Sequence, residues 1–381
     1  MASPIVLRLR AIWFQVHKWI GLSLALLIIP ISLSGAALVW HDGLDALVNP
    51  QRYAVSGSEA AQSPSVYVAA ARGAVGSEAL ISSIRYPEHE GSPVVVTAVR
   101  AVSAGADDRA PPERISVWLD PATGRILDSA PANAGLVRFL HGLHGSLQWQ
   151  GVGRQLVGWV GVFMFLSCIT GIWLWWPVTG SVRRGFRWKR QNSTNANLHH
   201  QMGFWILLPL AMLSFTGVWI SFPGVFSSFE SSAPKGGSPD RTRAMRARPL
   251  VDLSVTPDAA VAAAQSHATG RLVTLTWPTD QSRTWKAGFQ TARGAVEVEV
   301  AYSTGDVNPP RSPRPETRAR LMRRLHDGTR MGAIWQALIF LGGLVPAALA
   351  VTGFVMWVRS RGWRAKLARK RRARLTPQPA E

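Results

Sequence analysis

The sequence contains an internal repeat in which histidines and Ser/Thr-Gly dipeptides of the first half recur in the second half at one offset of 182 residues (17 to 199, and 144 to 326). The matched sets are His17 with His199, His144 with His326, Ser34-Gly35 with Thr216-Gly217, and Thr170-Gly171 with Thr352-Gly353. A repeat of this kind means that each half contributes one copy of every structural unit. The chain is therefore predicted to build one architecture twice, with its histidines as symmetry mates.

Four stretches lack Asp, Glu, Lys and Arg and are long enough to cross a bilayer. They contain 21 to 28 residues, against the roughly 20 that a helix needs to cross a hydrocarbon core about 30 Å thick. Tryptophans gather near their ends, where amphipathic rings lie at the level of the lipid headgroups. The sequence predicts an all-α membrane part of four transmembrane helices, duplicated 2+2, at residues 19–40, 156–176, 202–222 and 331–358.

Basic residues are concentrated in the short segments beside these spans, and the positive-inside rule places such segments in the cytoplasm. We predict a multi-pass protein of the bacterial inner membrane with both termini in the cytoplasm. Anionic lipid headgroups account for the net charge of +20 better than nucleic acid does. The predicted cytoplasmic segments are 1–18, 177–201 and the basic tail 359–381, and the predicted periplasmic segments are 41–155 and 223–330.

Each long periplasmic segment shows the pattern of a small α+β domain. Ala-rich helical runs at 66–74 and 257–266 precede alternating strand-like runs at 93–99, 115–119 and 295–300. Pro121 and Gly124 indicate a hairpin turn, and Gly305 lies in the matching turn of the second half. We expect two domains, each with one helix packed on an antiparallel sheet. Residues 136–149 of the first segment should form a separate interfacial helix, because glycines follow at 151 and 153.

The symmetry-related histidines are the candidate ligands. Spans one and three run outward, so His17 and His199 should lie at one depth near the inner face, and His144 and His326 at one depth near the outer face. Polar residues in membrane segments are costly and usually functional. Two histidines at one depth on different helices can supply both axial ligands of a haem iron. The sequence predicts two b haems, or one haem at the inner pair.

Several alternatives stay open from the residues alone. His200 is an alternate for His199, and His141 and His41 are alternates for members of the outer pair. Copper or zinc could bind the outer histidines instead, since imidazole suits both metals. The Ser/Thr-Gly dipeptides could serve close helix packing or leave room for a porphyrin. The single cysteine, Cys168, excludes a site built on several cysteines.

With these residues in place, the chain resembles the PepSY-associated transmembrane helix family of iron-regulated inner-membrane proteins. The resemblance implies PepSY-like periplasmic domains and a haem protein that passes electrons outward to a ferric siderophore, of hydroxamate type, and releases Fe(II). It implies no catalytic side chain beyond the haem ligands. No dinucleotide fingerprint is present, so a separate donor, a cytoplasmic reductase or quinol, must supply electrons. The carrying motifs are His17-Lys18-Trp19-Ile20-Gly21, the run from Leu140 to Leu147, Leu198-His199-His200-Gln201-Met202-Gly203 and Leu325-His326-Asp327-Gly328.

Two other functions compete with this ferric-siderophore reductase. The first is a PepSY-based binding or regulatory protein without redox activity, and the second is a siderophore or metal permease. The binding protein does not need the symmetry of the histidines, and for a permease four spans make a narrow pathway unless the protein oligomerises. For substrate docking, the sequence offers the tryptophans 118, 277 and 285, although each could equally belong to a core. It also offers the arginines of the second periplasmic segment, which could instead form a solvated, lipid-facing surface. They are Arg241, Arg243, Arg246, Arg248, Arg311, Arg314, Arg318, Arg320, Arg323 and Arg324.

Overall fold

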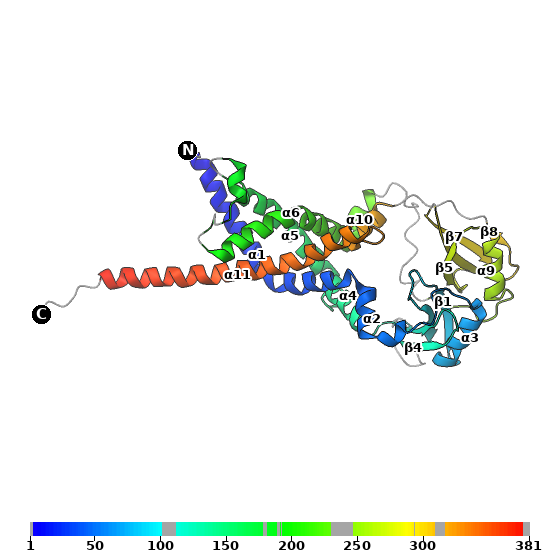
Figure 1. Cartoon of the computed structure of the whole chain (residues 1–381). Coiled ribbons are helices and arrows are strands. Elements are labelled where there is room, and N and C mark those ends of the chain that lie inside the picture. Colours follow the sequence, from blue (N-terminus) through cyan, green and yellow to red (C-terminus); the bar gives the residue numbers. More distant parts are fainter. Residues whose placement is uncertain are drawn as a thin grey trace. The chain divides into compact units, whose positions relative to one another are not determined.

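The computed structural model describes residues 3–100, 112–177, 181–188, 191, 193–229, 247–292, 294–308 and 317–375, with side chains up to residue 363 (Figure 1). The chain forms two compact units. The helical unit comprises Met1–His41, Phe139–Ser231 and Thr317–Glu381. The sheet unit comprises Asp42–Arg138 and Ser232–Glu316.

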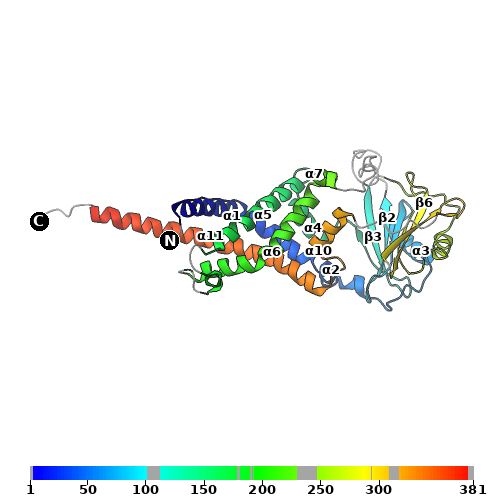
Figure 2. The ribbon, with the colours of Figure 1, turned by 90° about the horizontal axis from the view of Figure 1, so that it is seen from above.

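Four long helices form the helical unit, and each contains one of the predicted spans. They are α1 (Pro4–Leu38), α5 (Gly153–Trp175), α6 (Thr194–Ser221) and α11 (Ala333–Leu375). Helix α1 packs against α5 and α11, and α6 also packs against α5 and α11, which closes the four helices into a bundle (Figure 2). The repeat relates α1 to α6 and α5 to α11, so every helix contact in the bundle occurs twice.

The outer surface of this bundle is apolar. Leu26, Leu208 and Ile334 are each 78 to 83 % exposed, although burial of such a side chain is worth about 2 kcal/mol. A contiguous apolar surface of this kind requires a nonpolar environment. All four helices are long and apolar enough to cross a membrane, which agrees with the prediction of a multi-pass membrane protein.

Glycines bring the helices of the bundle close together at two equivalent places. A methyl group at Gly343 of α11 would lie 2.7 Å from the carbonyl oxygen of Ser32 on α1. A methyl group at Gly161 of α5 would lie 3.4 Å from the carbonyl oxygen of Ser214 on α6. Both glycines and both serines are separated by 182 residues. Such contacts let backbones approach, which drives helix association in lipid.

Short helices lie at the ends of the bundle. They are α4 (Leu136–Ser146), η2 (Val182–Phe186), α7 (Pro223–Phe226), η3 (Ser227–Phe229) and α10 (Arg318–Asp327). Leu147, Gln148 and Gly151 have positive φ angles of 50°, 60° and 82°, which separates α4 from α5 as the sequence predicts. Gly328 ends α10 in a left-handed conformation with a φ of 75°, the usual helix terminator.

The sheet unit contains one eight-stranded antiparallel sheet with the strand order β4-β3-β2-β1-β5-β6-β7-β8. The first half supplies β1 (Ala79–Arg85), β2 (Val94–Arg100), β3 (Glu113–Leu119) and β4 (Ile126–Pro131), and the second half supplies β5 (Arg271–Thr276), β6 (Thr284–Thr291), β7 (Gly294–Ala301) and β8 (Val307–Asn308). The two halves join where Ser83, Ile84 and Arg85 of β1 pair with Thr276, Leu275 and Thr274 of β5. The two α+β domains expected from the sequence therefore share a single sheet.

One hydrophobic core runs through both halves of this sheet. The helices α3 (Pro64–Val75) and α9 (Pro257–Gln265) cover one face, where fully buried side chains of both halves, such as Ile84, Phe289 and Trp285, pack together. The short elements α2 (His41–Val48) and η1 (Pro50–Tyr53) precede α3. Arg52 fixes η1 to the sheet, since its guanidinium bonds Asp128 at 2.6 Å and lies 3.9 Å from the ring centre of Trp118.

Two predictions about docking residues need correction. Trp277 and Trp285 lie in the core at 4 and 0 % exposure, because alternation along the strands directs them to the helix-covered face. Arg318, Arg320, Arg323 and Arg324 belong to α10 in the helical unit rather than to the second sheet domain. Arg241, Arg243, Arg246, Arg311 and Arg314 lie outside the described residues.

The predicted hairpin between β3 and β4 is built around a buried carboxylate. Asp120 is fully buried and accepts hydrogen bonds from the backbone N–H of Ser56 at 3.0 Å and the hydroxyl of Thr123 at 2.6 Å. Burial on its own would raise the pKa of Asp120, but these hydrogen bonds outweigh it and hold the pKa below its usual value. The corresponding turn of the second half carries Asp306, which is exposed.

We expect Gly343→Ala to destabilise the bundle by about 1–3 kcal/mol, because the added methyl group meets a backbone oxygen that cannot move aside cheaply. Unfolding of the full chain in mixed detergent micelles measures the change. Gly21→Ala in α1 is the matched control, since nothing lies within 4 Å of that position. Equal stability of the two variants would contradict the close packing of α1 on α11.

We expect Asp120→Asn to destabilise the sheet unit by about 2 kcal/mol at pH 7, because hydrogen bonds to a charged group are lost. A carboxylate with a lowered folded pKa contributes stability above its unfolded pKa of about 4, and the contribution disappears as the pH falls through the folded pKa. The difference from the parent chain should therefore shrink toward pH 3. Hydrogen exchange of β3 and β4 measures it, with Asp306→Asn as the control that changes little.

Candidate functional site: paired histidines

The four repeated histidines come from four different helices and form two pairs. His17 lies on α1 and His199 on α6, and their ring centres are 6.5 Å apart. His144 lies on α4 and His326 on α10, with ring centres 5.9 Å apart. Each pair takes one histidine from each half of the chain. The structure thus brings together the two sets that the repeat predicts.

Each ring of the His17–His199 pair is held through Nδ1 by a threonine of the neighbouring helix. The Nδ1 atom of His17 lies 2.8 Å from the hydroxyl oxygen of Thr170 on α5. The Nδ1 atom of His199 lies 2.9 Å from the hydroxyl oxygen of Thr352 on α11. Both contacts span 153 residues, so they are the same interaction made once in each half.

The rings of the His144–His326 pair are also held through Nδ1, but by different acceptors. The Nδ1 atom of His326 lies 2.9 Å from the hydroxyl oxygen of Thr216 on α6. Its equivalent, His144, bonds the backbone carbonyl of Ile31 on α1 at 2.8 Å. The hydroxyl of Ser34, which corresponds to Thr216, bonds the carbonyls of Pro30 and Ile31 instead. A serine thus replaces the threonine, and the main chain takes over its role.

These contacts define which nitrogen carries the proton. A carbonyl oxygen only accepts, so Nδ1 of His144 must be the protonated nitrogen. The hydroxyl of Thr216 lies 2.9 Å from the carbonyl of Met212, and that of Thr352 lies 2.9 Å from the carbonyl of Ala348. Each hydroxyl has one hydrogen, and we infer that it goes to the carbonyl while the oxygen accepts from Nδ1–H. The lone pair of every ring is then on Nε2, the tautomer that binds a metal.

The glycine of each dipeptide lies against the ring that the preceding residue or turn holds, and at Gly35 and Gly217 an added methyl group would crowd that ring. A methyl group at Gly35 would lie 2.6 Å from Cε1 of His144, and one at Gly217 would lie 3.3 Å from Cε1 of His326. At Gly171 and Gly353 the corresponding distances, to His17 and His199, are 3.4 and 3.5 Å. The four Ser/Thr-Gly dipeptides therefore lie against the four imidazole rings. The interpretations from sequence, close helix packing or room for a porphyrin, did not include this contact.

His144 and His326 lie outside the spanning helices, and burial keeps both rings neutral. Burial and, after it, the neighbouring His144 lower the pKa of His326 to about 4. Burial also lowers the pKa of His144. A neutral imidazole is the form that binds a metal ion, so no proton has to be displaced at neutral pH.

The alternate histidines lie in other environments. His200 stacks on Trp175 with an interplanar angle of 19°, and its Nε2 lies 3.3 Å from the carbonyl of Gly185. His41 and His141 lie together, with ring centres 6.3 Å apart. They form a third pair that has no equivalent in the second half, where Pro223 and Arg323 occupy the matching positions.

Arg10 was not among the predicted site residues, yet it supports the His17–His199 pair. It lies two turns before His17 on α1, and its guanidinium bonds the carbonyl oxygens of Leu174 and Trp176, the latter at 2.9 Å. These carbonyls end helix α5, where a positive charge is favourable. The contact fixes α1 against the end of α5 that carries Thr170. From sequence, a basic residue near the end of a span indicates only the orientation of that span. It does not predict that Arg10 bonds the carbonyl oxygens at the end of α5.

The spacing of the two pairs fits a shared metal ion. Two imidazoles that bind one ion through nitrogen, at about 2 Å each, place their ring centres about 6 Å apart. The pairs lie at 6.5 and 5.9 Å. Within the described residues, no three His, Cys, Asp or Glu side chains gather as ligands of a bare ion, so the predicted outer cluster of His41, His141, His144 and His326 is not such a group. Paired axial imidazoles suit haem.

A comparison with protein families matches residues 14–360 to the PepSY-associated TM region. The match includes all four helices of the bundle, both histidine pairs and all four dipeptides. The chain belongs to this family. A comparison with curated proteins finds no match. The matched region begins in the first half of the repeat and ends in the second.

We expect nitrogen-15 NMR of the haem-free protein to show the Nδ1–H tautomer for His144 and His326, because both Nδ1 atoms have an acceptor. In Thr216→Val the His326 ring loses its acceptor, and its signals should shift toward a mixture of tautomers. The exposed His89 is the reference. A predominant Nε2–H tautomer at His144 or His326 would contradict the assignment of the free lone pair.

Proposed function

We propose that this protein is a haem-containing electron-transfer protein of the bacterial inner membrane that reduces a ferric siderophore in the periplasm. The observation that carries the proposal is the two pairs of imidazoles, each held through Nδ1 with Nε2 left for a ligand bond. Haem b, bound through such a pair, supplies a one-electron carrier whose iron alternates between Fe(III) and Fe(II). His17 with His199 would hold one haem, and His144 with His326 the other.

The positions of the pairs along α1 and α6 suit transfer across a bilayer. His17 lies on α1, and Ser34-Gly35, which accommodates His144, lies 17 residues further along the same helix. At about 1.5 Å per residue the two sites are about 25 Å apart along the helix axis, close to the roughly 30 Å of the hydrocarbon core. Helix α6 repeats this spacing between His199 and Thr216. One pair would thus serve each face of the membrane.

The orientation of the protein follows from its basic segments. Arg8, Arg10 and Lys18 lie near the His17–His199 pair in sequence, and the long α11 ends in a run rich in Lys and Arg. The positive-inside rule would place these segments in the cytoplasm and the His144–His326 pair toward the periplasm. The sheet unit would then be a pair of joined PepSY-like domains in the periplasm.

The protein's own residues would hold and tune the cofactor rather than form bonds with the substrate. Thr170, Thr352 and Thr216 accept Nδ1–H bonds that raise the donor strength of each imidazole. Gly35 and Gly217 let the rings of His144 and His326 lie against the helices. One electron, from a separate cytoplasmic reductase or from quinol, would reach the siderophore and convert its Fe(III) to Fe(II), which hydroxamate oxygens hold less tightly.

The choice of substrate rests on resemblance. The motifs around His17, His144, His199 and His326 look like those of FoxB, the ferrioxamine reductase of siderophore uptake, which favours a hydroxamate siderophore. The enzyme activity would be that of a ferric-siderophore reductase. A PepSY-based binding or regulatory protein and a permease remain the competing functions, and both should survive loss of the histidine pairs. Siderophore flux into liposomes without reductant is the observation that would favour the permease.

We expect purified protein, made with ample haem, to show a sharp α-band after dithionite reduction, with about two haems per chain. His17→Ala and His199→Ala should each remove one haem, as should His144→Ala and His326→Ala, because one imidazole alone cannot complete the coordination. Ferrioxamine should reoxidise the reduced parent protein. His89→Ala and His267→Ala, both in the sheet unit, are controls that should keep full haem.

The same spectra separate the alternatives. Loss of haem in His200→Ala with full haem in His199→Ala would overturn the assignment of His199. One haem in the parent chain, lost only through His17 and His199, would leave the His144–His326 pair without this role. Protein without any haem would refute the reductase and favour the binding protein.

A further inference from the structure

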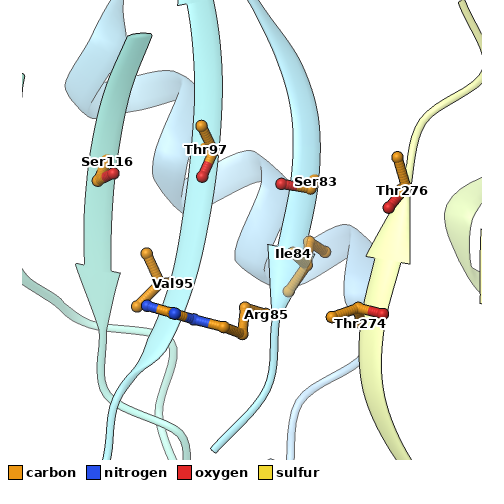
Figure 3. A pocket seen from close by; sticks show the side chains of 8 residues that line it. All are labelled: Ser83, Ile84, Arg85, Val95, Thr97, Ser116, Thr274 and Thr276. Carbon is orange, nitrogen blue, oxygen red and sulfur yellow. The ribbon is translucent and has the colours of Figure 1, made fainter. Parts of the chain in front are cut away.

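The sheet has a second face that α3 and α9 do not cover. Side chains alternate between the faces of a strand, so the neighbours of the buried Ile84, Val96 and Val117 point the other way. On that face lies an open hollow of about 350 Å³ over β3, β2, β1 and β5 (Figure 3). Its polar lining consists of Ser116, Thr97, Ser83, Thr276, Thr274 and Arg85.

Four of these hydroxyls form a single row across four strands. Ser116 pairs with Thr97, Thr97 with Ser83, and Ser83 with Thr276. Strands lie about 4.8 Å apart, so the row is about 14 Å long. It crosses the junction between the halves, because β1 belongs to the first and β5 to the second. Arg85 and Thr274 form the next pair along the same two strands.

The hydrogen-bonding capacity of this row is unused within the described part of the chain. None of the five hydroxyls, nor the guanidinium of Arg85, has a side-chain hydrogen bond or ion pair there. Ser116 is only 9 % exposed. Gly288 on β6 also makes room for Thr274, since a methyl group there would lie 2.4 Å from the threonine hydroxyl oxygen.

The lining selects for a ligand rich in oxygen. The side chain of Arg85 extends over β2 toward Val95 (Figure 3). The five N–H donors of its guanidinium therefore lie at the hollow, where they attract oxygens that carry negative charge. The hydroxyls both donate and accept, which suits amide and hydroxamate groups. No aromatic ring is among the lining residues, and Trp118 on the same strand as Ser116 is covered by Arg52. Binding would depend on hydrogen bonds and charge rather than on stacking.

We propose that this hollow is the docking site of the iron chelate, and that the row of hydroxyls with Arg85 holds its hydroxamate and amide oxygens. The proposal rests on the proposed reductase for the identity of the ligand. The volume lies within the range of small-molecule sites, about 300–1,000 Å³. An open hollow of this size holds one side of a trihydroxamate complex.

The test is binding of the gallium(III) complex of a neutral cyclic trihydroxamate to the full-length protein, measured by calorimetry. Gallium(III) resembles iron(III) in charge and size and is not reduced, so binding is separated from electron transfer. We expect the triple variant Ser83→Ala, Thr97→Val, Thr276→Val to weaken binding ten- to a hundred-fold, and Arg85→Gln to weaken it about tenfold. Arg114→Gln, two residues before Ser116 and outside the hollow, should stay within twofold.

Absence of gallium-complex binding to the parent chain, or equal binding by the hollow variants, would overturn the docking site. Reoxidation of the reduced haem by ferricyanide should be unchanged in these variants, while the KM for the ferric trihydroxamate rises with little change in kcat. If ferric trihydroxamate fails to reoxidise the haem but gallium-complex binding depends on the hollow, the reductase is refuted and the docking site stands.

Discussion

The hydrogen bond from an imidazole Nδ1 to an acceptor on the next helix determines most of this molecule's arrangement. It occurs four times, at 2.8 to 2.9 Å, and at Gly35 and Gly217 the lack of a side chain lets the rings of His144 and His326 approach. The bond attaches α4 and α10 to the bundle and fixes α1 and α6 against α5 and α11. It also determines the tautomer, and therefore the direction in which each ring can bind a ligand. Packing and chemistry depend on the same contact.

The repeat and the hydrophobic pattern predict much of this arrangement. A fixed offset shows which histidines are equivalent, and charge-free stretches predict the four spans. The pairing of His144 with Ile31 was not predictable, because a backbone carbonyl has no signature in sequence. Nor was the stacking of His200 on Trp175: the repeat favours His199 over His200 as the equivalent of His17, but it does not identify what His200 contacts.

In the sheet unit, sequence predicts local elements but not which strands pair. The helical runs and the hairpin at Asp120 follow from local composition and turn chemistry, so they are found from sequence. The joining of β1 to β5 is a contact between residues almost 200 positions apart, and alternation within a strand says nothing about its partner. Trp277 and Trp285 illustrate the result: without the sheet topology, a buried face and an open face of the same strands cannot be told apart.

The pairing of β1 with β5 has a consequence for the halves as separate molecules. A first half alone would leave the edge of β1 with unpaired N–H and C=O groups, the feature that leads sheets to associate, and its histidines would lack their counterparts. Two copies of one half could satisfy both needs by pairing about a two-fold axis. The chain thus resembles a homodimer whose two subunits have been joined into one polypeptide. Unlike the subunits of a homodimer, the two halves can differ in sequence. Arg85 is an example, because its position on β1 is matched across the axis by a threonine of β5. The two halves therefore form a nearly symmetric sheet, but the hollow on it is asymmetric.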